Sequence, residues 1–325
     1  MINILNKYSA QWYDMHFDLP ARHLHHLHGS SEGNILRRLV LCYHRSLFEC
    51  PYFSTFSMKS KPSLTNLTLV AVGLPHVDII WNNLTAAFVD KIGDDECVEL
   101  IRRAPLLENL SLRKIRAFSG PFPFPNARII RPHLHSLELS EIGREDVVAA
   151  IPDSVYLSSL EQWIHDHSPL PLDSMISFVG YLSSCLKIFK IGIENVDHPQ
   201  VNRLLWHLPS LEFLELRIRT ECLQDLDLLC ASTQSPLFLP HLQSLEFVCE
   251  FSFPWGSLLQ LFTPLHWHSL RVKVNSQFGC LNDIADETLK QLQNLIDAGF
   301  DLRLVRNGRI DLLQEYLRGE AFLDA

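Results

Sequence analysis

The stretch "LEFLEL", Leu211–Leu216, carries leucine at its first, fourth and sixth places. The same phrase returns along the chain as "LTNLTL" (64–69), "LENLSL" (107–112), "LHSLEL" (134–139) and "LQSLEF" (242–247). The shared places hold only apolar residues, with no nucleophile and no metal ligand among them. The phrase therefore indicates architecture and not catalysis.

Further copies extend the series to twelve along the whole chain. Another clear copy begins at Leu36, and weaker ones begin at Trp12, Leu84, Leu157, Leu186, Trp267 and Gly299. Successive copies start 20 to 32 residues apart. An LxxLxL pattern at this period is the signature of leucine-rich repeats.

The spacing inside the phrase explains why it has to be repeated. Residues two apart on a strand face the same side, so places 4 and 6 point inward together. One strand cannot bury these side chains alone, whereas a stack of repeats shares a core. Between the phrases, apolar spacing, acidic starts and Pro or Gly stops predict helices over residues 94–105, 171–185, 197–210 and 286–299. The segment "GPFPFPNAR", Gly120–Arg128, predicts a loop.

The predicted fold class is α/β, an irregular leucine-rich-repeat solenoid or horseshoe with a parallel concave sheet and convex helices. We predict that the solenoid fills residues 1–280 and that residues 281–325 form a C-terminal repeat with capping helices. A non-repeat protein of two α/β domains is the alternative.

Composition narrows the class of protein. Of the 325 residues, 47% are hydrophobic and 20% charged, which is typical of a folded globular chain. A net charge of −9 argues against a nucleic-acid-binding surface. The eight cysteines are scattered singly, which favours reduced thiols, and neither a signal peptide nor a membrane span is evident. We therefore expect an intracellular, cytoplasmic or nuclear protein that binds neither nucleic acid nor membrane.

Places 3, 5 and 7 of each phrase are expected to point outward from the concave sheet. Place 5 runs through His16, Val40, Thr68, Phe88, Ser111, Glu138, Glu161, Lys190, Glu215, Glu246, Arg271 and Arg303. Neighbouring strands lie about 4.8 Å apart, so the glutamates form a close ladder. One interpretation is a stripe that binds a basic segment of a partner. The other is a hydrated face with Lys190, Arg217 and Arg113 as local counter-charges.

Aromatic side chains on an exposed sheet are natural anchors for a partner protein. Together with the acidic ladder they give the predicted partner-binding residues Phe88, Glu138, Glu161, Trp163, Phe213, Glu215 and Glu246. Because the side-chain period of a strand is two, a slip of one residue in any repeat would bury these rings.

No motif of catalysis or cofactor binding stands out. His23, His25, His26 and His28 have spacings that suit a metal, but no third ligand follows at a useful distance. The segments "HWH" (266–268) and "HDHSPLPLD" (165–173) are explained equally well as surface histidines and a loop. No GxSxG, HExxH, Walker or GxGxxG motif occurs. We expect no catalytic residue, no metal and no cofactor, and so no enzyme.

Once the repeats are placed, one segment resembles the leucine-rich region of fungal, mushroom-type F-box proteins. It is residues 64–115, "LTNLTLVAVGLPHVDIIWNNLTAAFVDKIGDDECVELIRRAPLLENLSLRKI". Phrases of the same type are "RPHLHSLEL" (131–139), "LPSLEFLEL" (208–216) and "LPHLQSLEF" (239–247), and "LNKYSAQWYDMHFDLP" (5–20) resembles the start of that region. The resemblance covers nearly the whole chain.

The resemblance implies the substrate-binding repeat region of a receptor for a cullin-RING ubiquitin ligase. In such a receptor an F-box holds a Skp-type adaptor and the repeats hold the target protein. Here no segment like "LPxEILxxIF" stands before the repeats, so the adaptor is expected only where an F-box lies upstream. The alternative is a stand-alone leucine-rich-repeat scaffold or inhibitor with no link to ubiquitin ligases. The identity of the target protein is open in both cases.

Overall fold

The structure is a computed structural model. It describes residues 2–29, 33–43, 54–117, 121–169, 171–182, 184–193, 198–218, 224–249, 253, 255–262, 270–276 and 284–306. The chain gathers into two compact units, residues 1–160 (unit 1) and 161–325 (unit 2).

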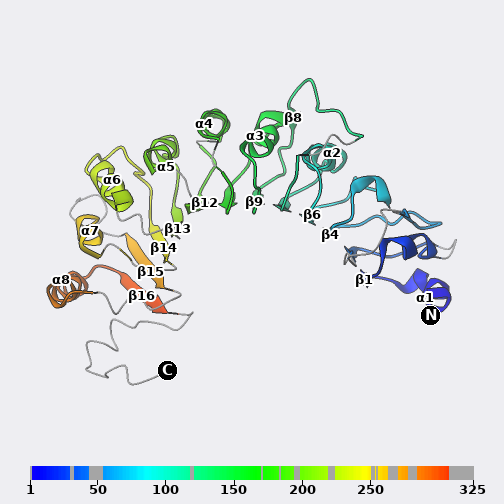
Figure 1. Cartoon of the computed structure of the whole chain (residues 1–325), viewed down its shortest axis with the longest axis horizontal. Helices are drawn as coiled ribbons and strands as arrows, with labels where there is room; N and C mark the ends of the chain where they lie inside the picture. The colour runs from blue at the N-terminus through cyan, green and yellow to red at the C-terminus, as the bar shows by residue number, and fades with distance from the viewer. Residues whose placement is uncertain are drawn as a thin grey trace, which may run out of the picture. The chain divides into compact units, whose positions relative to one another are not determined.

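The leucine-rich phrases form parallel strands that pair in chain order (Figure 1). The sheet of unit 1 holds β1 (Asp14–Asp18), β2 (Arg38–Cys42), β4 (Asn66–Val70), β6 (Ala86–Asp90), β7 (Asn109–Arg113) and β9 (Ser136–Ser140). The sheet of unit 2 holds β11 (Gln162–Asp166), β12 (Ile188–Ile193), β13 (Phe213–Ile218), β14 (Ser244–Cys249), β15 (Arg271–Ser276) and β16 (Leu302–Arg306).

Unit 1 also has two short strand pairs on the helix side of its repeats. They are β3 (Phe56–Ser57) with β5 (Val77–Asp78), and β8 (Ile129–Ile130) with β10 (Val155–Tyr156). The 3-10 turns of unit 1 are η1 (Ser9–Gln11), η2 (Ala21–His26) and η3 (Leu74–His76). Within the described residues, η2 follows β1 and η3 follows β4, where other repeats have a returning α-helix.

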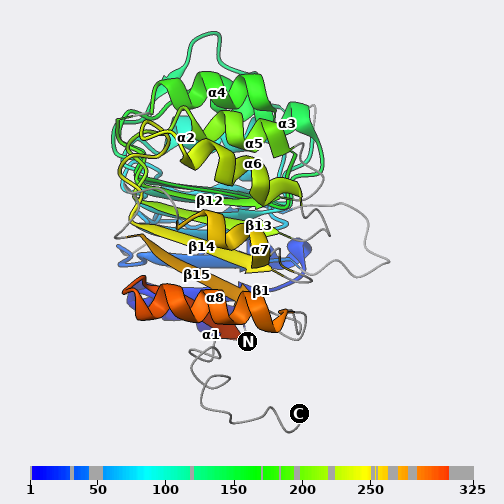
Figure 2. The same ribbon diagram turned by 90° about the vertical axis from the view of Figure 1, so that its left-hand side faces the viewer.

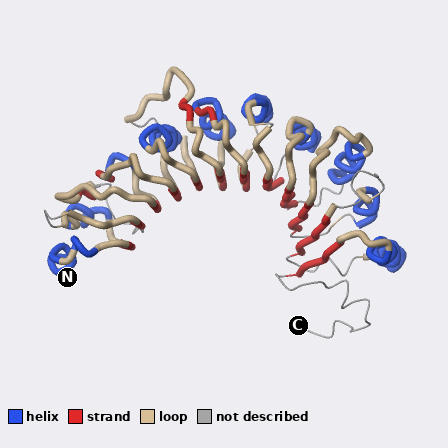
Figure 3. The backbone as a smooth tube through the Cα atoms, turned by 180° about the vertical axis from the view of Figure 1, so that it is seen from behind, coloured by secondary structure: helices blue, strands red, loops and turns tan. Residues whose placement is uncertain are grey.

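Helices run along the opposite side of each sheet from its open face (Figures 1 and 3). Unit 1 has α1 (Ile2–Lys7), α2 (Asp94–Arg103) and α3 (Glu145–Ser154). Unit 2 has α4 (Leu172–Gly180), α5 (His198–Leu205), α6 (Gln224–Thr233), α7 (Trp255–Gln260) and α8 (Asp286–Asp297), each packed against the next (Figure 2). Strand followed by returning helix, repeated, confirms the α/β leucine-rich-repeat solenoid. The four predicted helices are present as α2, α4, α5 and α8.

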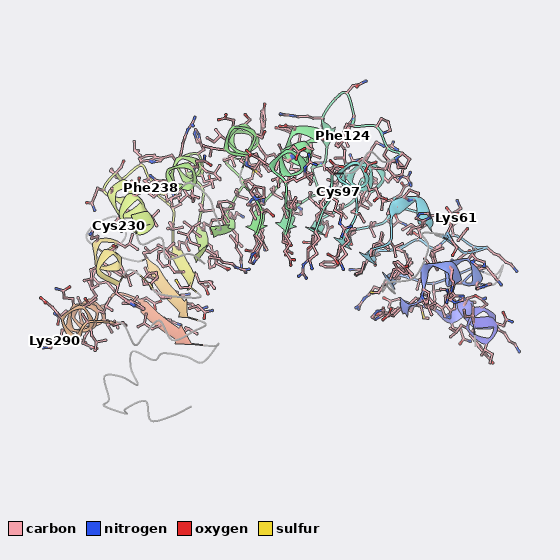
Figure 4. All side chains as sticks on the ribbon, viewed as in Figure 1. Lys61, Cys97, Phe124, Cys230, Phe238 and Lys290 are labelled. Carbon is pink, nitrogen blue, oxygen red and sulfur yellow. The ribbon has the colours of Figure 1, made fainter. Side chains whose placement is uncertain are left out.

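The core of each repeat lies between the sheet and the returning segment. In β13 the inward residues Leu214 and Leu216 are 0% and 4% exposed, and Leu211 at place 1 is 0% exposed. Cys97 on α2, labelled in Figure 4, is a fully buried free thiol whose pKa is raised by that burial. The inward places therefore pack as the LxxLxL pattern predicts.

A shared hydrogen-bond pattern at the entry bend sets the register of most strands. In unit 2 the backbone N–H groups of Glu212 and Phe213 both donate to the carbonyl of Lys187, at 2.9 Å each. In unit 1 the N–H groups of Glu108 and Asn109 donate in the same way to Thr85. Because places 2 and 3 share one acceptor in the preceding repeat, equivalent residues of successive strands lie directly side by side.

Four strands of unit 1, β4, β6, β7 and β9, are followed by a left-handed residue that is not glycine. Ala71, Lys91, Lys114 and Glu141 have φ angles of 57°, 64°, 52° and 54°. Such backbone is uncommon for residues with a Cβ. The N–H groups of Ala71 and Lys91 still donate to the next strand, at 2.8 and 2.9 Å, so the ladder continues for one step while the chain turns away.

Two side chains tie the α2 repeat to its neighbours. The Glu96 carboxylate accepts the N–H of Gly93 at the helix start (3.0 Å) and the N–H of Leu74 in the preceding repeat (2.8 Å). At the other end, Arg131 of the following repeat donates from Nε to the carbonyl of Ile101 (2.7 Å). Both ends of α2 therefore have partners for backbone groups that a helix leaves unpaired.

One repeat frame differs from the expectation. The phrase expected from Leu157 starts at Leu160, because Trp163 and His165 fill places 4 and 6 of β11, paired with Phe189 and Ile191. The sequence pattern did not show this frame because Trp163 and His165 stand at places 4 and 6, where many other repeats have leucine. The frame expected from Trp267 is also shifted, by two residues. The boundary expected near residue 280 stays a prediction, since α8 and β16 continue the repeat pattern and residues 277–283 and 307–325 lie outside the described residues.

His165 is an unusual core residue, with 0% of its surface exposed. Its Nε2 faces the carbonyls of Ser168 (3.2 Å) and Pro169 (3.0 Å), so that nitrogen carries the proton. Burial lowers the pKa of His165 from 6.5 to about 4, although both carbonyls favour the charged form. The imidazole is therefore neutral in the folded chain at neutral pH.

Replacing Leu214 with Asp is expected to lower the free energy of unfolding by more than about 3 kcal/mol. A large-to-small core change alone costs about 2–5 kcal/mol, and a buried unpaired carboxylate adds to that cost. Leu228→Asp, at a leucine that is 41% exposed on α6, is the matched control. Thermal unfolding followed by circular dichroism makes the comparison, and equal midpoints for the two variants would refute the core assignment.

The free energy of unfolding should depend on pH through His165. The unfolded state takes up a proton on His165 below pH 6.5, while the folded state takes one up only near pH 4. Stability should therefore fall as pH drops from 6.5 to about 4, by about 3 kcal/mol for this group, and should show no further change from it below that. In His165→Leu the fall should be smaller by that amount in urea unfolding measured at each pH. An unchanged slope would contradict the assignment.

Candidate functional site

On the open face of unit 1, the residues at place 5 are those expected from the sequence. The register places His16, Val40, Thr68, Phe88, Ser111 and Glu138 side by side at place 5. Phe88 and Glu138 are half-buried, with their outer parts on this face. The sequence frames of these six repeats are confirmed.

A shallow hollow of about 290 Å³ lies on this face over β4, β6, β7 and β9. We call it the unit 1 hollow. Its outward-facing residues are Asn66, Thr68, Ala86, Phe88, Asn109, Ser111, Ser136 and Glu138, and its floor is Leu67, Ala87 and Leu110. Seven of the eight outward residues are uncharged, so a partner would meet little charge here.

The hollow exists because one place is nearly empty. Ala86 stands between Asn66 and Asn109 in the place 3 row, and its methyl group leaves room that the two amides do not fill. Below it, Phe88 stands between Thr68 and Ser111. The sequence reasoning missed the place 3 residues, although the predicted outward direction of place 3 was the signal that identifies them.

Glu138 ends the hollow on β9. Ser111 Oγ donates to its carboxylate at 2.9 Å. Arg113, expected as a counter-charge for this ladder, instead pairs with Glu141 beyond the end of the strand (Nε to Oε1, 2.6 Å). Across the described residues of the chain, Glu138 has no ion pair with a basic side chain.

The open face of unit 2 is different because its charges neutralise one another. Glu215 is only 4% exposed and contacts Lys190 (2.9 Å) and Arg217 (2.7 Å). Burial alone would raise the pKa of Glu215, but the hydrogen bonds from these two cations outweigh it and the pKa lies below its usual value. Lys190 and Arg217 are thus the counter-charges that the second interpretation of the ladder expected.

Arg217 also reaches across a neighbouring strand. Its Nη1 donates to Asp166 Oδ2 at 2.6 Å, although β11 and β13 are separated by β12. Gly192 of β12 stands between them, and a Cβ built there would lie 2.3 Å from Asp166 Oδ1. The absent side chain of Gly192 is therefore what allows the Asp166–Arg217 pair to form.

Five further charged side chains described on this face are paired as well. Lys273 contacts Glu246 at 2.5 Å, and Asp301 accepts from both Arg271 (2.6 Å) and Arg303 (2.8 Å). A partner that covered this face would have to remove water from these pairs, which costs free energy unless each is replaced. The unit 1 hollow has one charged side chain, Glu138, so less charge has to lose its water there, and it is the stronger candidate site.

Phe213 lies on the open face of unit 2 as expected, half-buried at place 3 of β13. The ammonium of Lys190 sits 5.5 Å from the centre of its ring, a cation–π geometry. Phe213 thus already has a partner within the chain. Its role in binding another protein, like those of Phe88, Glu138, Glu215 and Glu246, stays a prediction.

Two of the predicted residues lie elsewhere. Trp163 is 0% exposed and packs on Phe178 and Phe189, with ring centroids 5.5 and 5.0 Å apart, so the expectation that it is a surface anchor is wrong. Glu161 is outside the place 5 row, where Ile164 stands beside Lys190. Both errors have one cause, the three-residue shift of the β11 repeat.

The histidine-rich segment forms the 3-10 turn η2 and the residues after it. The rings of His25 and His26 lie 3.8 Å apart, and those of His23 and His26 5.9 Å apart. Among the residues that the structure describes, no three His, Cys, Asp or Glu side chains are grouped so as to hold a metal ion. The "HWH" segment at 266–268 lies outside the described residues.

A second, larger hollow of about 450 Å³ lies where β4 and β6 of unit 1 end. Its lining includes Tyr43, Pro75, Lys91, Glu96 and Arg116. Glu96 is already bound to two backbone N–H groups. The charged lining residues, Lys91, Glu96 and Arg116, are of both signs and define no single ligand class.

No helix in the described ranges is long and apolar enough to cross a membrane.

The comparisons with known proteins identify no family. No family model matches the chain, and no curated protein matches it. Among solved structures, it is similar to a chain from "Crystal structure of TLR13-ssRNA13 complex", with 16% sequence identity and a TM-score of 0.40. The match covers 90% of this chain and 51% of the other, so this chain spans about half the length of that neighbour. A likeness of this degree carries no information on function.

Replacing Gly192 with Ala should separate Asp166 from Arg217 and leave a carboxylate buried without its cation. We expect a loss of about 2 kcal/mol or more in the free energy of unfolding, since breaking a buried pair from one side is costly. Gly180→Ala, where a Cβ meets nothing within 4 Å, is the matched control in the same unit. Adding Asp166→Ala to Gly192→Ala should recover part of the loss, and strictly additive effects would contradict this account.

Proposed function

We propose that this chain is a protein-recognition module, the target-binding repeat region of an F-box protein of a cullin-RING ubiquitin ligase. In this proposal the unit 1 hollow holds the target protein. The chain performs no chemistry itself, and it works in the cytoplasm or nucleus. A Skp-type adaptor joins it to the ligase through an F-box.

The observation that carries the proposal is the unit 1 hollow on an otherwise regular open sheet. A half-exposed aromatic ring among small and polar side chains offers an apolar contact together with hydrogen-bonding groups. Phe88 provides the kind of aromatic anchor that dominates protein interfaces. Such a surface suits recognition of another protein.

The sequence resemblance supports the same place. The passage 64–115, which resembles the repeat region of fungal F-box proteins, builds β4, β6, α2 and β7. Six of the eight outward residues of the unit 1 hollow lie within that passage. The segment whose sequence resembles the family therefore contains most of the residues of the surface proposed for recognition.

The test uses the protein expressed from its complete gene with an affinity tag. We expect a Skp-type adaptor and a cullin to co-purify with it, together with a target protein. Phe88→Asp should reduce target recovery roughly tenfold or more, since losing a hot-spot side chain costs about 2 kcal/mol. Adaptor recovery should be unchanged.

The matched control is Phe124→Asp. Phe124, labelled in Figure 4, is 44% exposed in the loop on the helix side of unit 1. Its replacement should leave the recovery of both target and adaptor unchanged. Recovery of a target without adaptor or cullin would reject the ligase role and leave the stand-alone scaffold or inhibitor. Equal target recovery from the two variants would place recognition away from the hollow.

A further inference from the structure

Among the described residues, Glu138 has no basic side chain within ion-pair distance. Two other carboxylates on the open face of unit 1 do: Asp14 lies 3.3 Å from Arg38, and Asp90 lies 3.8 Å from Lys91. In the described part of the chain Glu138 receives only the hydroxyl of Ser111. Its charge is therefore available to a cation that comes from outside the chain.

The opposite side of the unit 1 hollow offers hydrogen-bonding groups. Asn66 and Asn109 are exposed, and they stand two strands apart with Ala86 between them. For the Asn66 Nδ2 group, the Asn109 amide and the Ser136 hydroxyl, the described residues supply no hydrogen-bond partner. Amides can both donate and accept, so this row suits the backbone of a peptide.

The size of the hollow selects between ligand classes. Its volume of about 290 Å³ falls at the lower limit of small-molecule sites, which enclose most of their ligand. Here the floor is a sheet and the walls are short side chains, so nothing encloses a ligand. The space over Ala86 beside Phe88 suits one apolar side chain that projects from an extended chain.

We infer that the unit 1 hollow binds an extended peptide segment of the target that carries a large apolar side chain and a lysine or arginine two residues away. The apolar side chain lies on Ala86 against Phe88, and the basic side chain pairs with Glu138. This inference rests on the proposed function and adds the chemistry of the partner.

The spacing follows from strand geometry. Phe88 and Glu138 are two strands apart, which is about 10 Å at the usual strand separation. In an extended peptide, side chains two residues apart face the same way and are about 6.7 Å apart. The stem of a lysine or arginine covers the remaining distance. An acidic residue at that position would instead face Glu138 and be repelled.

The test probes an array of nine-residue peptides in which every position is varied, using the full chain with a fluorescent label. The chain should select peptides that have a large apolar residue two positions from lysine or arginine. Glu138→Lys should shift the selection at the second position towards aspartate or glutamate, by tenfold or more. Phe88→Ala should weaken selection at the apolar position and leave the basic preference.

Glu287→Lys is the matched control, since it changes net charge equally at an exposed residue of α8. A basic preference that persists in Glu138→Lys, or no selected peptide at all, would overturn the inference. Neither result would decide the proposed function, which depends on adaptor and target recovery with Phe88→Asp. Loss of target recovery there with no peptide preference would mean that the hollow recognises a folded surface.

Discussion

A strand with apolar side chains at places 4 and 6 can bury them only when its neighbour pairs with it in the same register. A shift by one residue would expose both side chains, because the side-chain period of a strand is two. In each unit this constraint is met by parallel pairing without offset, and two N–H groups that share one carbonyl secure it at the entry bends of β2, β4, β6, β7, β9, β12, β13 and β14. The returning helices then cover the inward side of the sheet.

The same constraint organises the open face. Because equivalent places stand side by side, one small residue leaves a gap between the side chains two strands apart. Unit 2 has such a gap at Gly192, and the long Arg217 crosses it to Asp166. Unit 1 has a gap at Ala86, where the flanking asparagines are too short to meet and a hollow remains. One geometry gives a closed ion-pair network in one unit and an open hollow in the other.

The errors of sequence reasoning have physical causes that can be named. The β11 repeat was misplaced because Trp163 and His165 occupy leucine places, and both are large enough to fill them. Helix α3 was missed because Pro152 lies inside it and usually signals an end, and α6 because its apolar residues do not favour one face strongly. From β1 to β9, where apolar residues keep places 1, 4 and 6, the sequence placed every strand of the unit 1 sheet and its outward row.

The sequence by itself determined the repeat, the fold class, the direction in which each place points, and the presence of Phe88 and Glu138 on the open face. It did so because burial of apolar side chains depends on local periodicity, which is written in the order of residues. Only the tertiary structure decided which charges are already neutralised and where the face is hollow. Those properties depend largely on residues of different strands, such as Arg217 with Asp166, which are 51 apart in sequence.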